Sequence, residues 1–202
     1  MHRSFLVFAA ALILLMAGAL FYAARIPVEH AQPVTVAETM DAAADAPVYP
    51  SFTLVDLDGN ERHFSEWEGK HRLLNFWATW CAPCRREIPL LKTFQDEQRE
   101  NGFVVIGIAV DFPDQVAAYA EEAKFNYPIL VGQEDAMAVA ETSGVEFIGM
   151  PFTMIVAADG ELINTHIGEI MDSHLEQIVR VLTMLDKGEI DKASARKALN
   201  FL

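Results

Sequence analysis

Two apolar runs joined by a helical segment constrain the fold of this chain most strongly. Residues 72–77 and 103–110 are rich in branched and aromatic side chains, a pattern typical of strands buried on both faces of a parallel sheet. Between them, apolar residues recur at helical spacing over 88–94. The region is therefore a β-α-β unit, and Cys81 and Cys84 stand where its first strand ends and its helix begins.

Further strand and helix patterns surround this unit. Asp58-Gly59-Asn60 is a turn composition, so a hairpin is expected to open the domain. We expect strands at 52–55, 62–64, 128–131, 152–156 and 162–167, and helices at 114–124 and 134–143, the latter ending before Gly144. A final helix is indicated by a stripe of apolar residues at Leu175, Ile178, Val179, Leu182 and Leu185. The fold class is α/β.

The N-terminal region predicts export. Residues 5–24 carry no charge and lie between Arg3 and Arg25, and a helix of this length covers about 30 Å, the thickness of a bilayer core. We expect residues 1–25 to be a single-pass anchor in the cell inner membrane. A cleaved secretory signal is the alternative, although its apolar region usually runs only about 7 to 15 residues.

Three further segments follow this block. Residues 26–49 contain three prolines and no periodicity, so they are expected to be a flexible linker with a reach of about 25 Å. Residues 50–186 form the expected folded domain. Residues 187–202 form a tail whose end is weakly helical, and no function is assigned to it.

Charge excludes one class of partner. Acidic residues outnumber basic residues 29 to 15, and the net charge is −14. Nucleic-acid affinity depends mainly on lysines and arginines that neutralise phosphates. Nucleic acid is therefore not expected as a partner.

The cysteine spacing indicates a disulfide that can open and close. Residues three apart on a helix lie about 5 to 6 Å apart, which a disulfide tolerates. The N-terminal end of a helix stabilises an anion, so the pKa of Cys81 is expected to fall below the free value of about 8.5. Arg85 and Arg86 either add to this effect or are simply solvated.

Other uses of two cysteines fit less well. A zinc site would need further ligands, but there is no third cysteine and the six histidines are scattered. Covalent haem attachment requires histidine at Arg85, and a peroxiredoxin would need threonine at Ala78 and proline at Leu74. We expect no metal and no cofactor. A purely structural disulfide remains an alternative.

Four motifs resemble those of one family. The sequence W-C-A-P-C-R-R-E-I-P at 80–89 follows N-F-W-A-T at 75–79, and G-M-P-F-T stands at 149–153. Together with A-D-G-E-L-I at 158–163, they resemble the TlpA/ResA-type, membrane-anchored, thioredoxin-like thiol-disulfide oxidoreductases over about residues 48–186. The resemblance implies a thioredoxin-like fold with an N-terminal β-hairpin and a central helix/strand insertion.

The resemblance also implies roles for the two cysteines and Pro151. Cys81 would be the exposed nucleophile and Cys84 the resolving thiol of a redox-active disulfide. Pro151 would be a cis-proline facing that disulfide, although only about 5 to 6% of X-Pro bonds in folded proteins are cis. A cis bond there would present the Met150 backbone to an incoming peptide.

Glu87 and Trp80 complete the expected site. Glu87 stands three residues after Cys84 on the same helical face, and the resemblance favours a role in accepting and returning the proton of Cys84. A solvated helix glutamate is the alternative. Asn75 stands where cytoplasmic thioredoxins carry a buried acid. Trp80 adjoins the nucleophile and is expected at the rim, in contact with substrate.

The expected function is extracytoplasmic thiol-disulfide exchange, with the catalytic domain on the periplasmic side of the membrane. An integral membrane thiol donor of the DsbD or CcdA kind would reduce the protein, which would then reduce exported client proteins. The implied clients are apocytochrome c, in cytochrome c maturation, and metal-site assembly proteins. Phe152 stands where CcmG proteins typically carry glutamate, which disfavours that specialisation. A DsbA-like oxidase and a tethered binding module with a structural disulfide are the alternatives.

Overall fold

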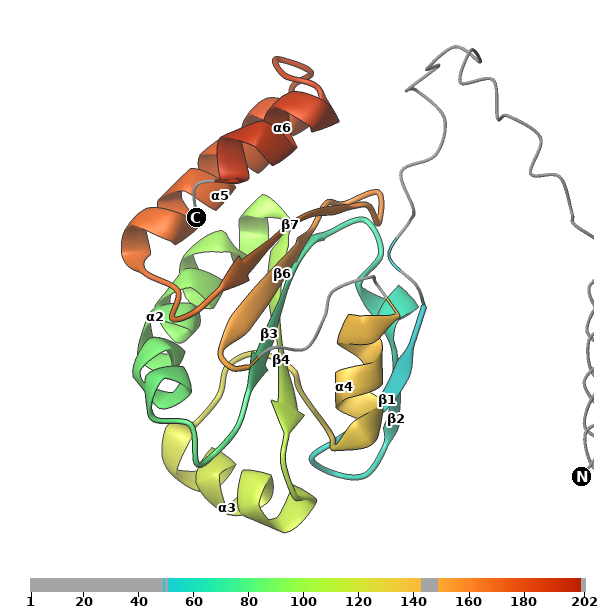
Figure 1. Ribbon diagram of the computed structural model, residues 1–202, viewed down its shortest axis with the longest axis vertical. Helices are drawn as coiled ribbons and strands as arrows, with labels where there is room; N and C mark the ends of the chain where they lie inside the picture. Colours follow the sequence, from blue (N-terminus) through green and yellow to red (C-terminus); the bar gives the residue numbers. More distant parts are fainter. Residues whose placement is uncertain (1–48, 50, 143–148, 201–202) are drawn as a thin grey trace, which may run out of the picture. The chain divides into compact units, whose positions relative to one another are not determined.

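Seven strands form one mixed sheet at the centre of the described chain (Figure 1). The computed structural model describes residues 49, 51–142 and 149–200, all within one unit, Ala43–Leu202. The strands are β1 (Thr53–Asp56), β2 (Glu61–His63), β3 (His71–Trp77), β4 (Phe103–Val110), β5 (Ile129–Gly132), β6 (Phe152–Val156) and β7 (Leu162–Ile167). Their order is β2-β1-β5-β4-β3-β6-β7. Strands β3, β4 and β5 are parallel, and the remaining pairs are antiparallel.

Helices cover both faces of this sheet. They are α2 (Ala82–Gln98), α3 (Pro113–Ala123), α4 (Glu134–Glu141), α5 (Asp172–Asp186) and α6 (Lys192–Leu199), with the short 3-10 helices η1 (Phe64–Trp67) and η2 (Arg99–Asn101). One core joins the sheet to α2, α3, α5 and α6, and a second joins its other face to α4 and the N-terminal hairpin. Figure 1 shows α4 and α2 on opposite sides of the sheet.

The predicted β-α-β unit is confirmed. Every residue of β3 is buried, as expected for a central strand covered on both faces. Helix α2 continues through Pro89, and η2 then ends at Asn101. The following residue, Gly102, has a φ of 82°, the left-handed conformation that favours glycine. The chain therefore turns at this glycine and enters β4.

Most strands and helices begin and end within one residue of the sequence-based expectation, and two of the differences have a structural reason or reach two residues. The second strand ends at His63, and η1 begins at Phe64. Phe64 and Trp67 are both buried, and a spacing of three places both on one side of a 3-10 turn. The helix expected at 134–143 ends at Glu141, and the expected stop at Gly144 lies outside the described residues.

The C-terminal tail contributes to the core. Asp191 caps α6, accepting a hydrogen bond from the Ser194 N–H at 2.8 Å. Ala195 and Leu199 on α6 are fully buried in the same core as α5. Glu161 is also buried and forms ion pairs with Lys192 and Arg196 of α6. The tail thus packs as part of the fold.

The expected membrane anchor, residues 1–25, lies outside the described residues, as does the linker except for Tyr49. Tyr49 is buried, and its N–H donates to the Gly160 carbonyl at 2.7 Å. No helix in the described part of the chain has the length and hydropathy needed to cross a bilayer.

Candidate active site

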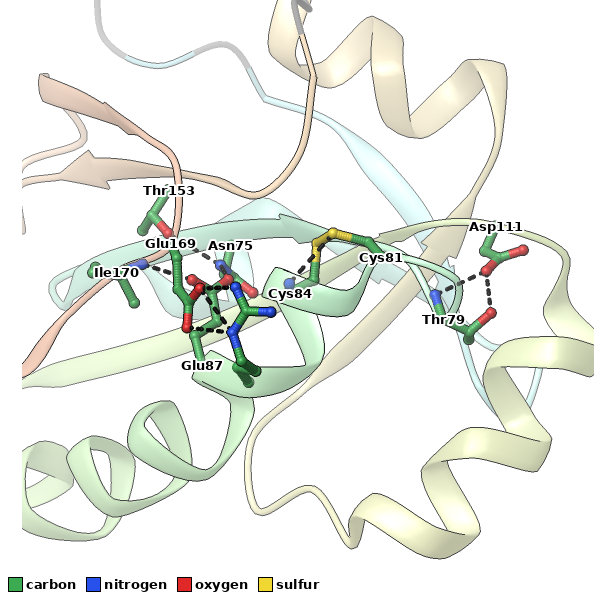
Figure 2. The surroundings of a disulfide bond; sticks show 10 residues. Asn75, Thr79, Cys81, Cys84, Glu87, Asp111, Thr153, Glu169 and Ile170 are labelled. Atoms are coloured by element: carbon green, nitrogen blue, oxygen red, sulfur yellow. Dashed lines mark hydrogen bonds and ion pairs between the residues drawn. A yellow bond between two sulfur atoms is a disulfide. The ribbon is translucent and has the colours of Figure 1, made fainter.

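The two cysteines form a disulfide at the corner between β3 and α2 (Figure 2). Their Cα atoms lie 5.3 Å apart, in agreement with the spacing expected for the first turn of a helix. Cys81 is the N-cap residue of α2, and its sulfur accepts a hydrogen bond from the Cys84 N–H at 3.3 Å. Cys84 is fully buried, whereas Cys81 is 5% exposed. An attacking sulfur therefore has more access to Cys81.

The turn that leads into the disulfide is fixed by a residue from another strand. Asp111 follows β4, and its Oδ2 accepts hydrogen bonds from the Thr79 N–H at 2.9 Å and from the Thr79 hydroxyl at 2.5 Å. Its Oδ1 accepts from the Phe112 N–H at 2.8 Å. Asp111 thus connects the ends of β3 and β4 and holds the segment before Cys81.

Glu87 is buried beneath this corner. It is only 2% exposed, so the alternative of a solvated helix glutamate is wrong. Its Oε1 accepts from the Asn75 side-chain N–H at 2.8 Å, and its Oε2 accepts from the Ile170 N–H at 2.7 Å. Burial raises the pKa of Glu87 to about 7, although these two hydrogen bonds act in the opposite direction. A carboxyl group of this kind changes protonation near neutral pH.

The Asn75 amide connects Glu87 to the sheet. Asn75 on β3 pairs with Thr153 on β6, and its side-chain N–H groups donate to Glu87 and, at 3.1 Å, to the Thr153 hydroxyl. All three side chains are buried. This polar group inside an otherwise apolar core fixes the orientation of the Glu87 carboxyl group.

The peptide bond between Met150 and Pro151 is cis, as the family resemblance implies. The Pro151 carbonyl accepts a hydrogen bond from the Gly168 N–H at 2.9 Å. Phe152 begins β6 and pairs with Phe76 near the end of β3. Met150 and Pro151 therefore lie at the end of the sheet where β3 leads into the disulfide turn.

Large exposed apolar side chains occur at this end of the sheet. Trp80 is 70% exposed, whereas Trp77 is buried and packs against Tyr119 and Phe125. Three other apolar side chains that are more than half exposed belong to the loop after β4, the end of β7 and the turn before α5: they are Phe112, Ile167 and Met171. We call these four residues the apolar rim.

The structure places the two arginines after Cys84 differently from each other. Both side chains are exposed, but Arg86 also forms an ion pair with Glu169 in the turn between β7 and α5. The sequence indicated neither this pair nor the role of Asp111, because their partners are 83 and 32 residues away. No cluster of three potential metal-ligating side chains occurs among the residues that the structure describes.

Comparison with known proteins agrees with this geometry. Residues 47–165 match the AhpC/TSA family. The chain is 32% identical to the thiol-disulfide oxidoreductase ResA of Geobacillus kaustophilus over 142 residues, which cover 68% of this chain and 79% of the relative. It is 33% identical to the thioredoxin-like protein YneN of Bacillus subtilis over 134 residues, covering 63% and 74%.

Solved structures show the same fold. A thioredoxin-family thiol:disulfide interchange protein from Chlorobium tepidum superposes with a TM-score of 0.61 at 29% identity, covering 69% of this chain and 99% of that protein. A secreted thiol-disulfide isomerase from Corynebacterium glutamicum gives a TM-score of 0.61 at 23% identity, covering 68% and 85%. The chain therefore belongs to the AhpC/TSA family and, within it, to the ResA-type, thioredoxin-like thiol-disulfide oxidoreductases.

Proposed function

We propose that this oxidoreductase works outside the cytoplasm and reduces disulfides of exported client proteins. The observation that carries the proposal is the arrangement on α2. Cys81 caps the helix, Cys84 is buried one turn later, and the buried Glu87 carboxyl group follows after three more residues. A nucleophile, a resolving thiol and a proton carrier thus lie within the first two turns of α2.

The exchange begins with the Cys81 thiolate. It attacks one sulfur of the client disulfide, so a Cys81–client bond forms, the client disulfide breaks, and the second client sulfur leaves as a thiolate and takes up a proton. Cys84 then loses its proton and attacks the Cys81 sulfur. The Cys81–Cys84 disulfide forms, and the first client sulfur leaves and takes up a proton. The client has gained two electrons from the protein and two protons, one released by Cys84 and one taken from solvent.

Helix geometry supports the first step. The N–H groups in the first turn of α2 have no partner within the helix, and the positive end of the helix dipole favours an anion. The Cys84 N–H already points at the Cys81 sulfur at 3.3 Å. The same N–H can donate to the thiolate in the reduced protein, which lowers the cost of charging Cys81.

Glu87 supports the second step. Cys84 is fully buried, so water has no direct access to its proton. Because the pKa of Glu87 is raised to about 7, its carboxylate can accept this proton and its acid form can return it within the physiological pH range. Glu87 is therefore proposed as the base for Cys84.

The client would bind across the apolar rim. A client sulfur must reach Cys81, so the residues beside the client cysteine would contact Trp80 on one side and Met150 and Pro151 on the other. An extended segment would pair its main chain with the Met150 backbone and place apolar side chains against the rim. This arrangement assigns Trp80, Met150 and Pro151 to substrate binding.

The N-terminal sequence supports the proposed location. An uncharged segment at 5–24 would hold the protein at the inner membrane, with the catalytic domain on the periplasmic side. Because that compartment is oxidising, an integral membrane protein of the DsbD or CcdA kind would supply the electrons. The proposed clients are apocytochrome c and metal-site assembly proteins.

A trapping experiment tests the proposal. The Cys84→Ala variant of the full chain retains the nucleophile and lacks the resolving thiol, so mixed disulfides with exported proteins should accumulate in the cell. Cys81→Ala/Cys84→Ala is the matched control and should capture none. If the single variant captures no exported protein, the proposed enzymatic role is wrong.

Equilibration of the full chain with glutathione buffers tests the direction of transfer. A reductase should have a potential near that of thioredoxin, about −270 mV, whereas an oxidase of the DsbA type should lie near about −120 mV. A value near the second figure would replace the proposed reductase with a thiol oxidase.

A further inference from the structure

An ion pair beside the active site has no part in the exchange described above. Arg86 lies next to Glu87 on α2, and its Nε lies 3.2 Å from Oε1 and 3.1 Å from Oε2 of Glu169. Its Nη2 also donates to Oε2. The pair joins α2 to the turn between β7 and α5 (Figure 2).

The same turn carries two main-chain donors on either side of Glu169. The Gly168 N–H donates to the Pro151 carbonyl at 2.9 Å, and the Ile170 N–H donates to Glu87 Oε2 at 2.7 Å. One short segment thus contacts both the cis-proline and the buried carboxyl group. Two side chains of α2 therefore contact this segment: Glu87 at the Ile170 N–H and Arg86 at the Glu169 carboxylate.

We propose that Arg86 and Glu169 are positioning residues for Glu87. In this arrangement Arg86 fixes the turn that supplies the Ile170 N–H, and its positive charge offsets the negative charge of Glu169. The inference rests on the proposed function in one respect only, namely that Glu87 exchanges a proton with Cys84.

The electrostatic surroundings give the expected direction. Burial is the main cause of the raised pKa of Glu87, the Ile170 N–H lowers this pKa, and the charge of Glu169 raises it. Loss of Arg86 should weaken the hydrogen bond from the Ile170 N–H to Glu87. It also leaves the negative charge of Glu169 without its positive partner. Both changes favour the protonated form of Glu87.

Two other polar groups interact with Glu87: the Asn75 side chain of β3 donates a hydrogen bond to it, and the Tyr127 phenol in the loop before β5 interacts with its charge. The Tyr127 phenol is buried, and its pKa is raised mainly by this burial, so it is neutral when Glu87 titrates. His166 approaches the Glu169 carbonyl oxygen with Nε2 at 3.3 Å and does not contact the Glu169 carboxylate.

Three substitutions separate charge from position. Arg86→Gln should raise the pKa of Glu87 by about half a unit to one unit, the size expected for one partly screened charge nearby. Arg86→Lys keeps the positive charge and should restore most of the original value. Glu169→Gln keeps an acceptor for Arg86 but removes the negative charge, so the pKa of Glu87 should fall.

Arg85→Gln is the matched control. Arg85 stands on the same turn of α2, and its side chain has no ion-pair partner within the described part of the chain. Its loss removes the same charge from α2 without removing a contact to the turn before α5. The pKa of Glu87 should therefore change by less than about 0.2.

Carboxyl-carbon NMR titration of the oxidised full chain measures the Glu87 pKa without any client. Amide hydrogen exchange measures the position of Ile170: Arg86→Gln should accelerate exchange at this N–H several-fold, and Arg85→Gln should leave it unchanged. The inference would be overturned if the Glu87 pKa were the same in Arg86→Gln and Arg85→Gln. It would also be overturned if Arg86→Gln left the exchange rate of the Ile170 N–H unchanged. Because neither measurement involves a client, failure of the Cys84→Ala trap would reject the proposed function and leave this inference standing.

Discussion

Replacing Glu87 with glutamine should change how stability depends on pH. In the folded protein Glu87 holds its proton up to about pH 7, whereas in the unfolded chain it releases it near its ordinary value of 4.5. The folded state therefore binds more protons between these two pH values, and the free energy of unfolding falls as pH rises through this range. At about 1.4 kcal/mol per pH unit, the loss reaches about 3 kcal/mol.

The glutamine variant lacks this titration. Its side chain is neutral at every pH and can accept from only one of the two donors, Asn75 and Ile170, so an unpaired donor costs about 1 to 3 kcal/mol at all pH values. The free energy of unfolding of Glu87→Gln, measured relative to that of the wild type, should therefore rise by about 3 kcal/mol from pH 4 to pH 8. This rise does not depend on the cost of the unpaired donor, because that cost is the same at every pH.

Urea unfolding of the oxidised wild type and the variant at several pH values between 4 and 8 measures the difference. Glu97→Gln, at an exposed position on the same helix, is the control, and its stability should stay within about 0.5 kcal/mol of the wild type throughout. If the pH profiles of the wild type and Glu87→Gln are parallel, Glu87 is not protonated in the folded state near neutral pH. Its proposed proton-carrying role would then lose its basis.

The same variant should slow the release of a mixed disulfide by about 100-fold at pH 7, the usual contribution of a positioned base. The lifetime of a Cys81 adduct with a model peptide measures this step. A lifetime equal to that of the wild type would remove Glu87 from the proposed mechanism, even if the stability profiles differ as expected.

Three further substitutions test the surroundings of the site. Asp111→Ala should cost about 2 to 4 kcal/mol in urea unfolding, because the N–H and hydroxyl of Thr79 lose their acceptor; a loss below 1 kcal/mol would contradict its role in fixing the turn. Trp80→Ala should change the free energy of unfolding by less than about 0.5 kcal/mol, because this side chain is exposed. It should slow exchange with a protein disulfide but not exchange with dithiothreitol. If the variant and the wild type react with the protein disulfide at the same rate, Trp80 does not bind the client. Leu199→Ala should lower the free energy of unfolding by about 2 to 3 kcal/mol, whereas Lys197→Ala, at an exposed position on the same helix, should leave it almost unchanged. Equal effects of the two substitutions would show that α6 does not contribute to the core.

Local patterns were enough to predict the centre of the fold. The buried strands β3 and β4 are contiguous apolar runs, and the turn residues at 58–60 and 159–160 mark both hairpins directly. The alternation of these runs with helical stripes fixed the β-α-β unit and hence the position of Cys81 and Cys84. Such features depend on neighbours within one element, which a single sequence displays.

Contacts between distant segments could not be predicted in this way. Asp111 and Glu169 are ordinary acidic residues in the sequence, and only the folded chain brings them to Thr79 and Arg86. The burial of Glu87 likewise depends on the turn before α5, which covers it from 83 residues away. The tail is weakly apolar on its own, and its docking depends on the burial of Leu199 and on the ion pairs of Glu161.

The reactivity of Cys81 in the reduced full chain tests the central claim most directly. The rate of its reaction with a small aromatic disulfide, followed from pH 4 to 10, should report a thiolate with a pKa below the free value of about 8.5. The rate at pH 7 should exceed that of an unfolded Trp-Cys-Ala-Pro-Cys peptide at least tenfold, and Cys81→Ser should abolish it. A titration at or above the free value, with a rate no higher than that of the peptide, would contradict the account.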